Sequence, residues 1–91
     1  IINTVAEHFD LTTADLIGNK RSSKIAYPRQ IAMYLCRHMT DTTLKIIGDS
    51  LGGRDHTTIM SGIRRIEKEV DTSDETREII NILKKKINPT K

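Results

Sequence analysis

The sequence predicts an all-α fold, a compact bundle of about six helices. Apolar residues recur at helical spacings along almost the whole of the 91 residues. Only 3% of the residues are aromatic while 36% are apolar, so the core must be built from Ile and Leu, which suits helices packed on helices. No repeat, low-complexity run or Pro/Gly-rich linker divides the sequence, and we therefore treat 1–91 as a single domain.

The first quarter of the chain predicts two short helices and a loop. Residues 2–9 carry apolar side chains at helical spacing and predict the first helix. Thr12 followed three residues later by Asp15 resembles a capping box, which predicts the start of a second helix that ends at Gly18. Residues 19–26 are polar and basic without a helical period, so we expect a cationic loop there.

A proline marks the expected start of the third helix. The residue before a proline avoids the helical region, and proline itself suits the first helical position, so Tyr27-Pro28 predicts a boundary. Arg29 and Arg37 are expected to lie off the buried face of this helix. That face is predicted to consist of Ile31, Ala32, Leu35, Cys36 and Met39.

A short helix, a glycine turn and a longer helix are predicted in the second half of the chain. Apolar spacing predicts a helix over 44–51, and a double glycine ends it in a turn over 52–54. Asp55 is expected to cap the N-terminus of a longer helix over 55–70. These two helices and their turn have the outline of a helix-turn-helix, whose second helix enters the DNA major groove. A last helix is predicted over 74–87.

The positive charge of the chain is concentrated in its middle. Residues 1–15 contain three acids and no base, residues 16–65 contain nine Lys or Arg against three Asp, and residues 66–91 balance. A local basic field is what binding to a polyanion requires, although a solvated face without a partner has the same composition.

The composition excludes several kinds of protein. Cys36 is the sole cysteine, so an internal disulfide is excluded, and no Cys/His spacing fits a structural zinc site, so neither a metal nor a cofactor is expected. No apolar run approaches the roughly 20 residues that a membrane-spanning helix needs, and no export signal is present, so we expect a soluble cytoplasmic protein. The chain opens with Ile1 rather than Met, which indicates a fragment of a longer protein.

The residues at the start of the predicted helix 55–70 have side chains that are able to read bases. His56, Thr57 and Thr58 can donate or accept hydrogen bonds, and a threonine methyl can contact thymine. Asp55 is repelled by phosphates unless it accepts a hydrogen bond, for example from cytosine N4. It can equally be an N-cap that never meets DNA, and both roles can coexist.

The sequence around the double glycine is specific enough to indicate a family. Residues 47–59 read Ile-Gly-Asp-Ser-Leu-Gly-Gly-Arg-Asp-His-Thr-Thr-Ile, which closely resembles the signature of the C-terminal DNA-binding domain of the bacterial chromosomal replication initiator family, DnaA. The resemblance continues through 20–30, Lys-Arg-Ser-Ser-Lys-Ile-Ala-Tyr-Pro-Arg-Gln, and to both ends of the chain. It implies sequence-specific binding of double-stranded DNA at the replication origin, in the nucleoid. Residues 1–10 would then belong to the core or form a linker helix after an ATPase domain.

The resemblance also implies a set of DNA contacts. Arg21 would enter the minor groove, which is narrow and most negative in A·T-rich DNA. If Arg29 contacts a phosphate, Arg29→Ala should weaken binding to every sequence and should lower the slope of log affinity against log salt concentration by about one. Major-groove base contacts are implied for Asp55, His56, Thr57 and Thr58. Phosphate contacts, which orient the domain without reading sequence, are expected from Lys20, Lys24, Arg29, Gln30, Arg37, Arg54 and Arg65.

Two positions depart from the family pattern. Lys45 stands where the family commonly has a proline near the bases, so a phosphate or base hydrogen bond can replace an apolar contact with thymine. Met60 stands where a smaller or branched apolar residue is frequent, and it could still meet a methyl group. We include both in the predicted base-reading set.

Other interpretations fit parts of the sequence. Residues 48–52 match the Gly-x-Ser-x-Gly pattern of esterases, but the surrounding period is helical and no strand precedes the serine, so we expect no enzyme. No Gly-x-x-x-x-Gly-Lys-Ser/Thr motif occurs, so ATP binding would belong to the full-length protein only.

Two alternatives concern the partner. A helix-turn-helix transcriptional regulator, which usually binds a palindrome as a dimer, is the alternative function. Because no coiled-coil heptad is present, we expect one monomer on an asymmetric, A·T-containing site. The amphipathic first helix leaves contact with membrane lipid open, although its acidic residues argue against anionic membranes.

Overall fold

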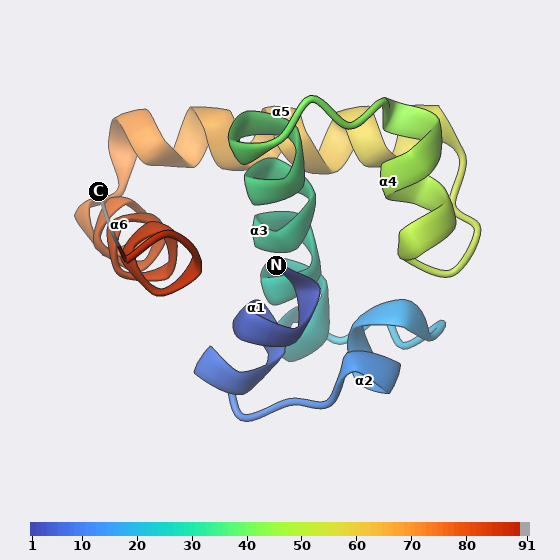
Figure 1. The fold of residues 1–91 in the computed structure, drawn as a ribbon, viewed down its shortest axis with the longest axis horizontal. Coiled ribbons are helices and arrows are strands. Elements are labelled where there is room, and N and C mark those ends of the chain that lie inside the picture. The colour runs from blue at the N-terminus through green and yellow to red at the C-terminus, as the bar shows by residue number, and fades with distance from the viewer. Residues whose placement is uncertain (90–91) are drawn as a thin grey trace.

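Six helices follow one another along residues 1–89, the part of the chain that the computed structural model describes (Figure 1). No strand occurs within this range, so the predicted all-α class is confirmed. The helices are α1 (Ile2–His8), α2 (Thr13–Ile17), α3 (Ser23–Met39), α4 (Leu44–Ser50), α5 (His56–Thr72) and α6 (Asp74–Ile87).

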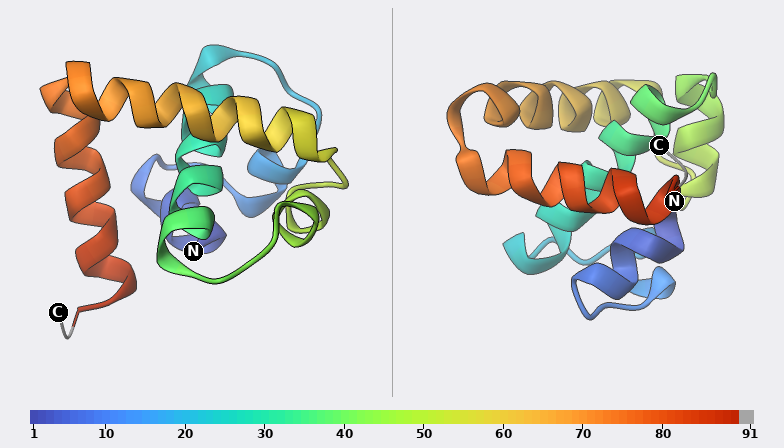
Figure 2. Two further views of the ribbon diagram at one scale, coloured as in Figure 1. Left: turned by 90° about the horizontal axis from the view of Figure 1, so that it is seen from above. Right: turned by 60° about the vertical axis from the view of Figure 1, so that its left-hand side comes forward.

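The third helix, α3, is the centre of the fold. It contacts each of the other helices and runs through the middle of Figure 1, with α4 and α6 on either side. Figure 2 shows α5 lying across α3 and α6 turning back from the end of α5. The predicted buried face is confirmed at Ile31, Ala32 and Leu35, which are fully buried, whereas Cys36 and Met39 are half-buried.

The first helix, α1, belongs to the core. Val5 and Ala6 are buried, and the helix packs against α2, α3 and α6. Its apolar face is therefore occupied by the protein itself. Across residues 1–89, no helix combines the length and the apolar character that crossing a membrane would require.

The predicted helix boundary at Tyr27-Pro28 is wrong. Pro28 lies inside α3, which begins five residues earlier at Ser23, so the cationic loop covers residues 18–22 and Lys24 lies in the first turn of the helix. The missing N–H of Pro28 deprives only the carbonyl of Lys24, an exposed residue near the helix start, where water can replace the bond. The proline ring is fully buried, and this burial offsets the cost of the interruption.

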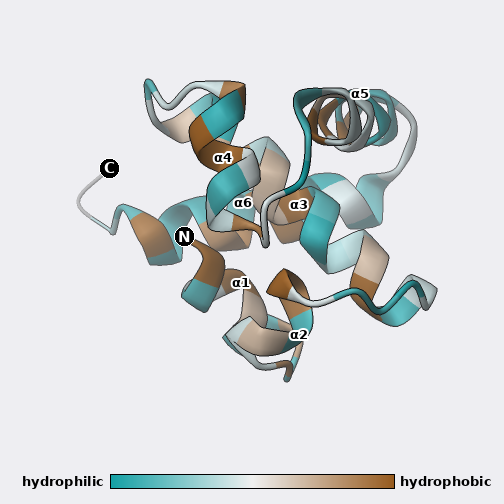
Figure 3. Ribbon diagram, turned by 90° about the vertical axis from the view of Figure 1, so that its right-hand side faces the viewer, coloured by the Kyte–Doolittle hydropathy of each residue, from teal (hydrophilic) through white to brown (hydrophobic). Residues whose placement is uncertain are grey.

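The second half of the chain follows the prediction closely. α4 covers Leu44–Ser50 against a predicted 44–51, and α5 covers His56–Thr72 against 55–70. Asp55 is the N-cap of α5, as expected, and α6 has the predicted bounds. Figure 3 looks at α5 end-on with α4 beside it, and the buried stripe of α5 is formed by Ile59, Ile63 and Ile66.

The turn between α4 and α5 depends on two glycines. The carbonyl oxygen of Gly48 accepts hydrogen bonds from the backbone N–H groups of Leu51, Gly53 and Arg54, which closes the turn. A Cβ at Gly48 would overlap the carbonyl oxygen of Arg54. Gly52 has a φ of +83° and lies against the carbonyl of Ile17, so a side chain there would be strained as well as obstructed. The turn can therefore adopt this conformation only when neither position carries a side chain.

We expect Gly48→Ala to lower the free energy of unfolding by about 3 kcal/mol or more, because the backbone of the turn would have to move. Gly53→Ala is the matched control, since a Cβ there meets nothing within 4 Å and adds only the strain of a positive φ. That strain should cost about 1–2 kcal/mol. Thermal unfolding followed by circular dichroism measures both, and equal losses would contradict the overlap.

Candidate nucleic-acid interface

The residues at the start of α5 face outward. Asp55, His56, Thr57 and Thr58 are all exposed, and Met60, one turn further on, is half-buried. The Oδ1 atom of Asp55 accepts a hydrogen bond from the backbone N–H of Thr58 at 2.8 Å. This N–H holds the pKa of the Asp55 carboxyl below its usual value, so the group stays ionised. The predicted N-cap is therefore present, while the residue stays accessible to a partner.

Two arginines hold the C-terminal end of α2. Arg29 comes from α3 and Arg54 from the turn before α5, and each guanidinium donates to main-chain carbonyl groups. The Nε atom of Arg29 is 2.7 Å from the oxygen of Leu16, and its Nη2 atom is 3.2 Å from the oxygens of both Asp15 and Gly18. Arg54 donates to the oxygens of Ile17, Gly18 and Leu51. These bonds connect the start of the basic loop, residues 18–22, to α3 and to the turn before α5.

The basic loop lies on the same side of the molecule as the tip of α5. Lys20 and Arg21 line one hollow together with Gly53 and Thr58, and Arg29 and Arg54 form part of its wall. Figure 3 looks onto this side, with the end of α5 near the top and the hydrophilic loop between α2 and α3 below it. The hollow therefore brings Lys20 and Arg21 of the loop next to Thr58 of α5.

Arg29 differs from its prediction. It was expected off the buried face of α3, but it is 6% exposed and points into the protein. Burial, and next the nearby charge of Arg54, lower the pKa of Arg29, although a guanidinium stays protonated. Since carbonyl groups occupy its Nε and Nη2 donors, we assign Arg29 a structural role in place of the expected phosphate contact.

We expect Arg29→Ala to destabilise the fold by about 2–3 kcal/mol, because it leaves carbonyl groups at the end of α2 without donors. Arg37→Ala is the control: Arg37 lies on the same helix, is exposed and donates to one carbonyl at 3.4 Å. It should change stability by no more than about 0.5 kcal/mol. Chemical denaturation measures both variants, and an Arg29→Ala protein as stable as the natural one would refute the structural role.

The other predicted phosphate contacts are spread over the surface. Lys20 and Lys24 are exposed in or next to the basic loop, and Lys20 lies 3.2 Å from Asp15. Arg65 on α5 donates to Gln30 on α3 at 2.7 Å, which pairs these two candidates. Arg37 is about 20 Å along α3 from the loop at the 1.5 Å rise of a helix, beside the segment that leads to α4.

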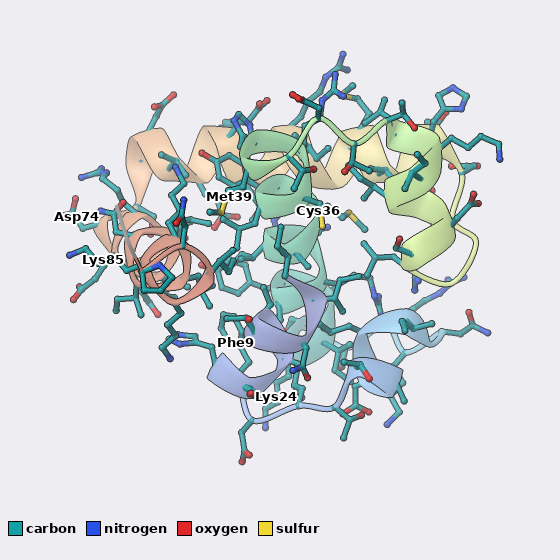
Figure 4. The ribbon with its side chains drawn as sticks, viewed as in Figure 1. Phe9, Lys24, Cys36, Met39, Asp74 and Lys85 are labelled. Carbon is teal, nitrogen blue, oxygen red and sulfur yellow. The ribbon has the colours of Figure 1, made fainter. Side chains whose placement is uncertain are left out.

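Lys45 and the lysines of α6 occupy different surroundings. Lys45 is exposed on α4, lies 3.4 Å from Asp49, and lines a hollow with Asp55 and His56. Lys45 therefore lies beside two other residues of the predicted base-reading set. Figure 4 shows Lys85 across the molecule from α4, so the lysines of α6 do not join the basic loop.

Sequence reasoning missed the role of Gly62. A Cβ on this residue of α5 would overlap the sulfur of Met33 and lie 3.2 Å from the side chain of Gln30. The missing side chain lets α5 approach α3 closely at the groove where Gln30 and Thr57 lie. A glycine inside an apolar helical pattern was the available signal, since it is costly there unless packing requires it.

The fold and the exposed tip of α5 define a helix-turn-helix protein of the all-α class. A family model described as the bacterial dnaA protein helix-turn-helix matches residues 1–66. The chain therefore belongs to this family.

Relatives from several bacteria support the assignment. The chain is 47% identical over 90 residues to the chromosomal replication initiator protein DnaA of Lachnoclostridium phytofermentans, covering 99% of this chain and 20% of that protein. It is 48% identical over 84 residues to the protein of the same name from Latilactobacillus sakei, covering 92% and 19%. The Treponema pallidum relative is 39% identical over 87 residues, covering 96% and 19%. The chain thus spans about a fifth of the length of these relatives.

Proposed function

We propose that this chain recognises a short, asymmetric, A·T-containing site in double-stranded DNA, with one copy bound to each site. The observation that carries the proposal is the exposed series from Asp55 to Thr58 at the tip of α5, next to a basic loop fixed on the same side. A helix tip of this kind fits the major groove, and cations beside it attract the phosphates that flank the groove.

The proposed contacts divide into base reading and positioning. His56, Thr57 and Asp55 would reach base edges in the major groove, supported by Thr58, while Arg21 would enter the adjacent minor groove. Lys45 and Met60 would add contacts near the bases. Positioning on the phosphates would come from Lys20, Lys24, Gln30, Arg37 and Arg65. Arg54 would act as Arg29 does, by holding the loop, because its guanidinium is bonded to carbonyl groups.

The relatives carry the name of chromosomal replication initiators, and this name supports a site at the replication origin, in the nucleoid. We propose that the chain binds DNA without catalysing a reaction and without a cofactor, and that ATP binding belongs to other parts of the full-length protein. Ser50, the serine of the esterase-like pattern, is the last residue of α4, whereas an esterase elbow needs the serine to follow a strand.

The alternative of a transcriptional regulator is not favoured, because the chain belongs to the DnaA helix-turn-helix family. Contact with membrane lipid is not part of the proposal. The apolar side of α1 packs against α2, α3 and α6, and Glu7, the acid on this helix, is exposed.

Selection of bound duplexes from a random pool tests the proposal directly. We expect one asymmetric sequence with A·T pairs beside the major-groove contacts. Recovery of a palindrome would favour the regulator, and recovery of no sequence at all would overturn specific recognition.

On the selected duplex, His56→Ala and Thr57→Ala should each lose roughly 1–3 kcal/mol of discrimination at particular base pairs. Asp55→Asn should also alter the preferred base while keeping the helix cap, since asparagine caps as well as aspartate. Thr72→Ala, at the far end of the same helix, is the control and should leave discrimination unchanged. Binding to single-base variants of the duplex measures each effect, and equal losses on cognate and scrambled duplex would refute base reading.

A further inference from the structure

A chain of polar contacts runs from α6 to the exposed edge of α5. The hydroxyl of Tyr27 on α3 lies 2.6 Å from the hydroxyl of Thr76 on α6, and Thr76 donates to Oε1 of Glu69 at 3.2 Å. The other carboxylate oxygen of Glu69 accepts from Nε of Arg65 at 2.9 Å. Arg65 in turn donates to Oε1 of Gln30 at 2.7 Å. Five side chains from three helices are therefore connected.

The direction of these bonds follows from the chemistry of the groups. A carboxylate can only accept, so the proton of the Thr76 hydroxyl is directed at Glu69. Because a hydroxyl has one proton, Tyr27 must be the donor toward Thr76. Thr76 is 2% exposed, so its hydroxyl has little access to water as a substitute partner. One oxygen of Glu69 is thus held by Thr76 inside the protein, while the other contacts Arg65.

The contact with Glu69 restricts the directions in which Arg65 and Gln30 can point. Arg65 donates two of its N–H groups, one to Glu69 and one to Gln30. Half of its side chain is exposed, so the remaining N–H groups are available to an anion. The amide of Gln30 must turn its oxygen toward Arg65, because a guanidinium has no acceptor, and its two amide protons are then free to donate elsewhere. Arg65 therefore offers its remaining donors to solvent, and Gln30 keeps both amide protons for another partner.

We propose that Glu69 is a positioning residue for DNA binding, which, with Thr76 and Tyr27 behind it, holds Arg65 and Gln30 ready for a backbone phosphate. This inference rests on the proposed function. A guanidinium whose rotamer is already fixed loses less conformational entropy when it binds, and fixed donors also fix the register of the duplex.

Simple electrostatics and the proposal predict opposite changes in DNA affinity when Glu69 is removed, so the direction of the change distinguishes them. An acid beside a phosphate contact repels DNA, so its removal should strengthen binding to every sequence if charge alone mattered. If Glu69 positions Arg65, its removal should weaken binding in spite of the lost negative charge. Glu67 offers a matched comparison, since it lies on the same helix, carries the same charge and pairs with His38 at 3.0 Å instead.

The experiment measures binding of the 91-residue chain to its selected duplex and to a scrambled duplex, by fluorescence anisotropy over a series of salt concentrations. We expect Glu69→Ala to weaken binding to both duplexes by about threefold to tenfold, and to lower the salt slope by up to about one. Glu67→Ala should bind equally well or more tightly. In an Arg65→Ala background, Glu69→Ala should cause no further weakening.

Thr76→Val is the second variant, because it removes the buried hydroxyl without changing any charge. It should weaken binding in the same direction, by about twofold to threefold. Circular dichroism monitors folding of each variant, and Tyr27→Phe tests the same support should either of the others fail to fold.

Tighter binding by Glu69→Ala, equal to that of Glu67→Ala, would overturn the inference, and so would an undiminished loss in the Arg65→Ala background. Failure of the natural chain to bind either duplex would overturn the proposed function as well. Binding by the natural chain together with an unaffected Glu69→Ala variant would overturn only the role of Glu69.

Discussion

The candidate interface depends on two guanidinium groups that bind main-chain carbonyl groups at the end of α2. α2 has only five residues, which is too short for a helix to be stable by itself, so its position has to come from tertiary contacts. Arg29 and Arg54 supply charge-assisted hydrogen bonds at the end of the helix where a positive charge suits the dipole. Because both bind Gly18, the basic loop that starts there is held against the turn before α5.

The same two residues explain why charge is an ambiguous guide to a binding surface. Sequence patterns count cations but cannot tell whether a guanidinium meets a phosphate or a carbonyl group of its own chain. Arg29 looked external because the apolar period of α3 left it off the predicted face. The period was misleading here, since α3 is enclosed on most of its circumference and Met33 and Tyr34 are also buried.

Features that depend on neighbouring residues could be predicted well from the sequence. The N-cap at Asp55 and the capping box of Thr12 and Asp15 are both present, since each needs only a side chain within three residues of its partner. Pro28 was misplaced because its tolerance depends on burial of its ring against distant parts of the chain. The need for glycine at Gly48 was likewise hidden, because the carbonyl that excludes a side chain comes from the far side of the turn.

The proposed base reading and the proposed phosphate binding have separate supports within this small fold. The tip of α5 is set by the Asp55 cap and the turn at Gly48, whereas Arg65 is set by contacts that reach α6 through Glu69 and Thr76. The match to the family model ends at residue 66, before both of these supporting residues. Selectivity and affinity should therefore respond to changes in different parts of the chain. On this proposal α6, which lies outside the helix-turn-helix, contributes to the interface through the side chains that it holds in place.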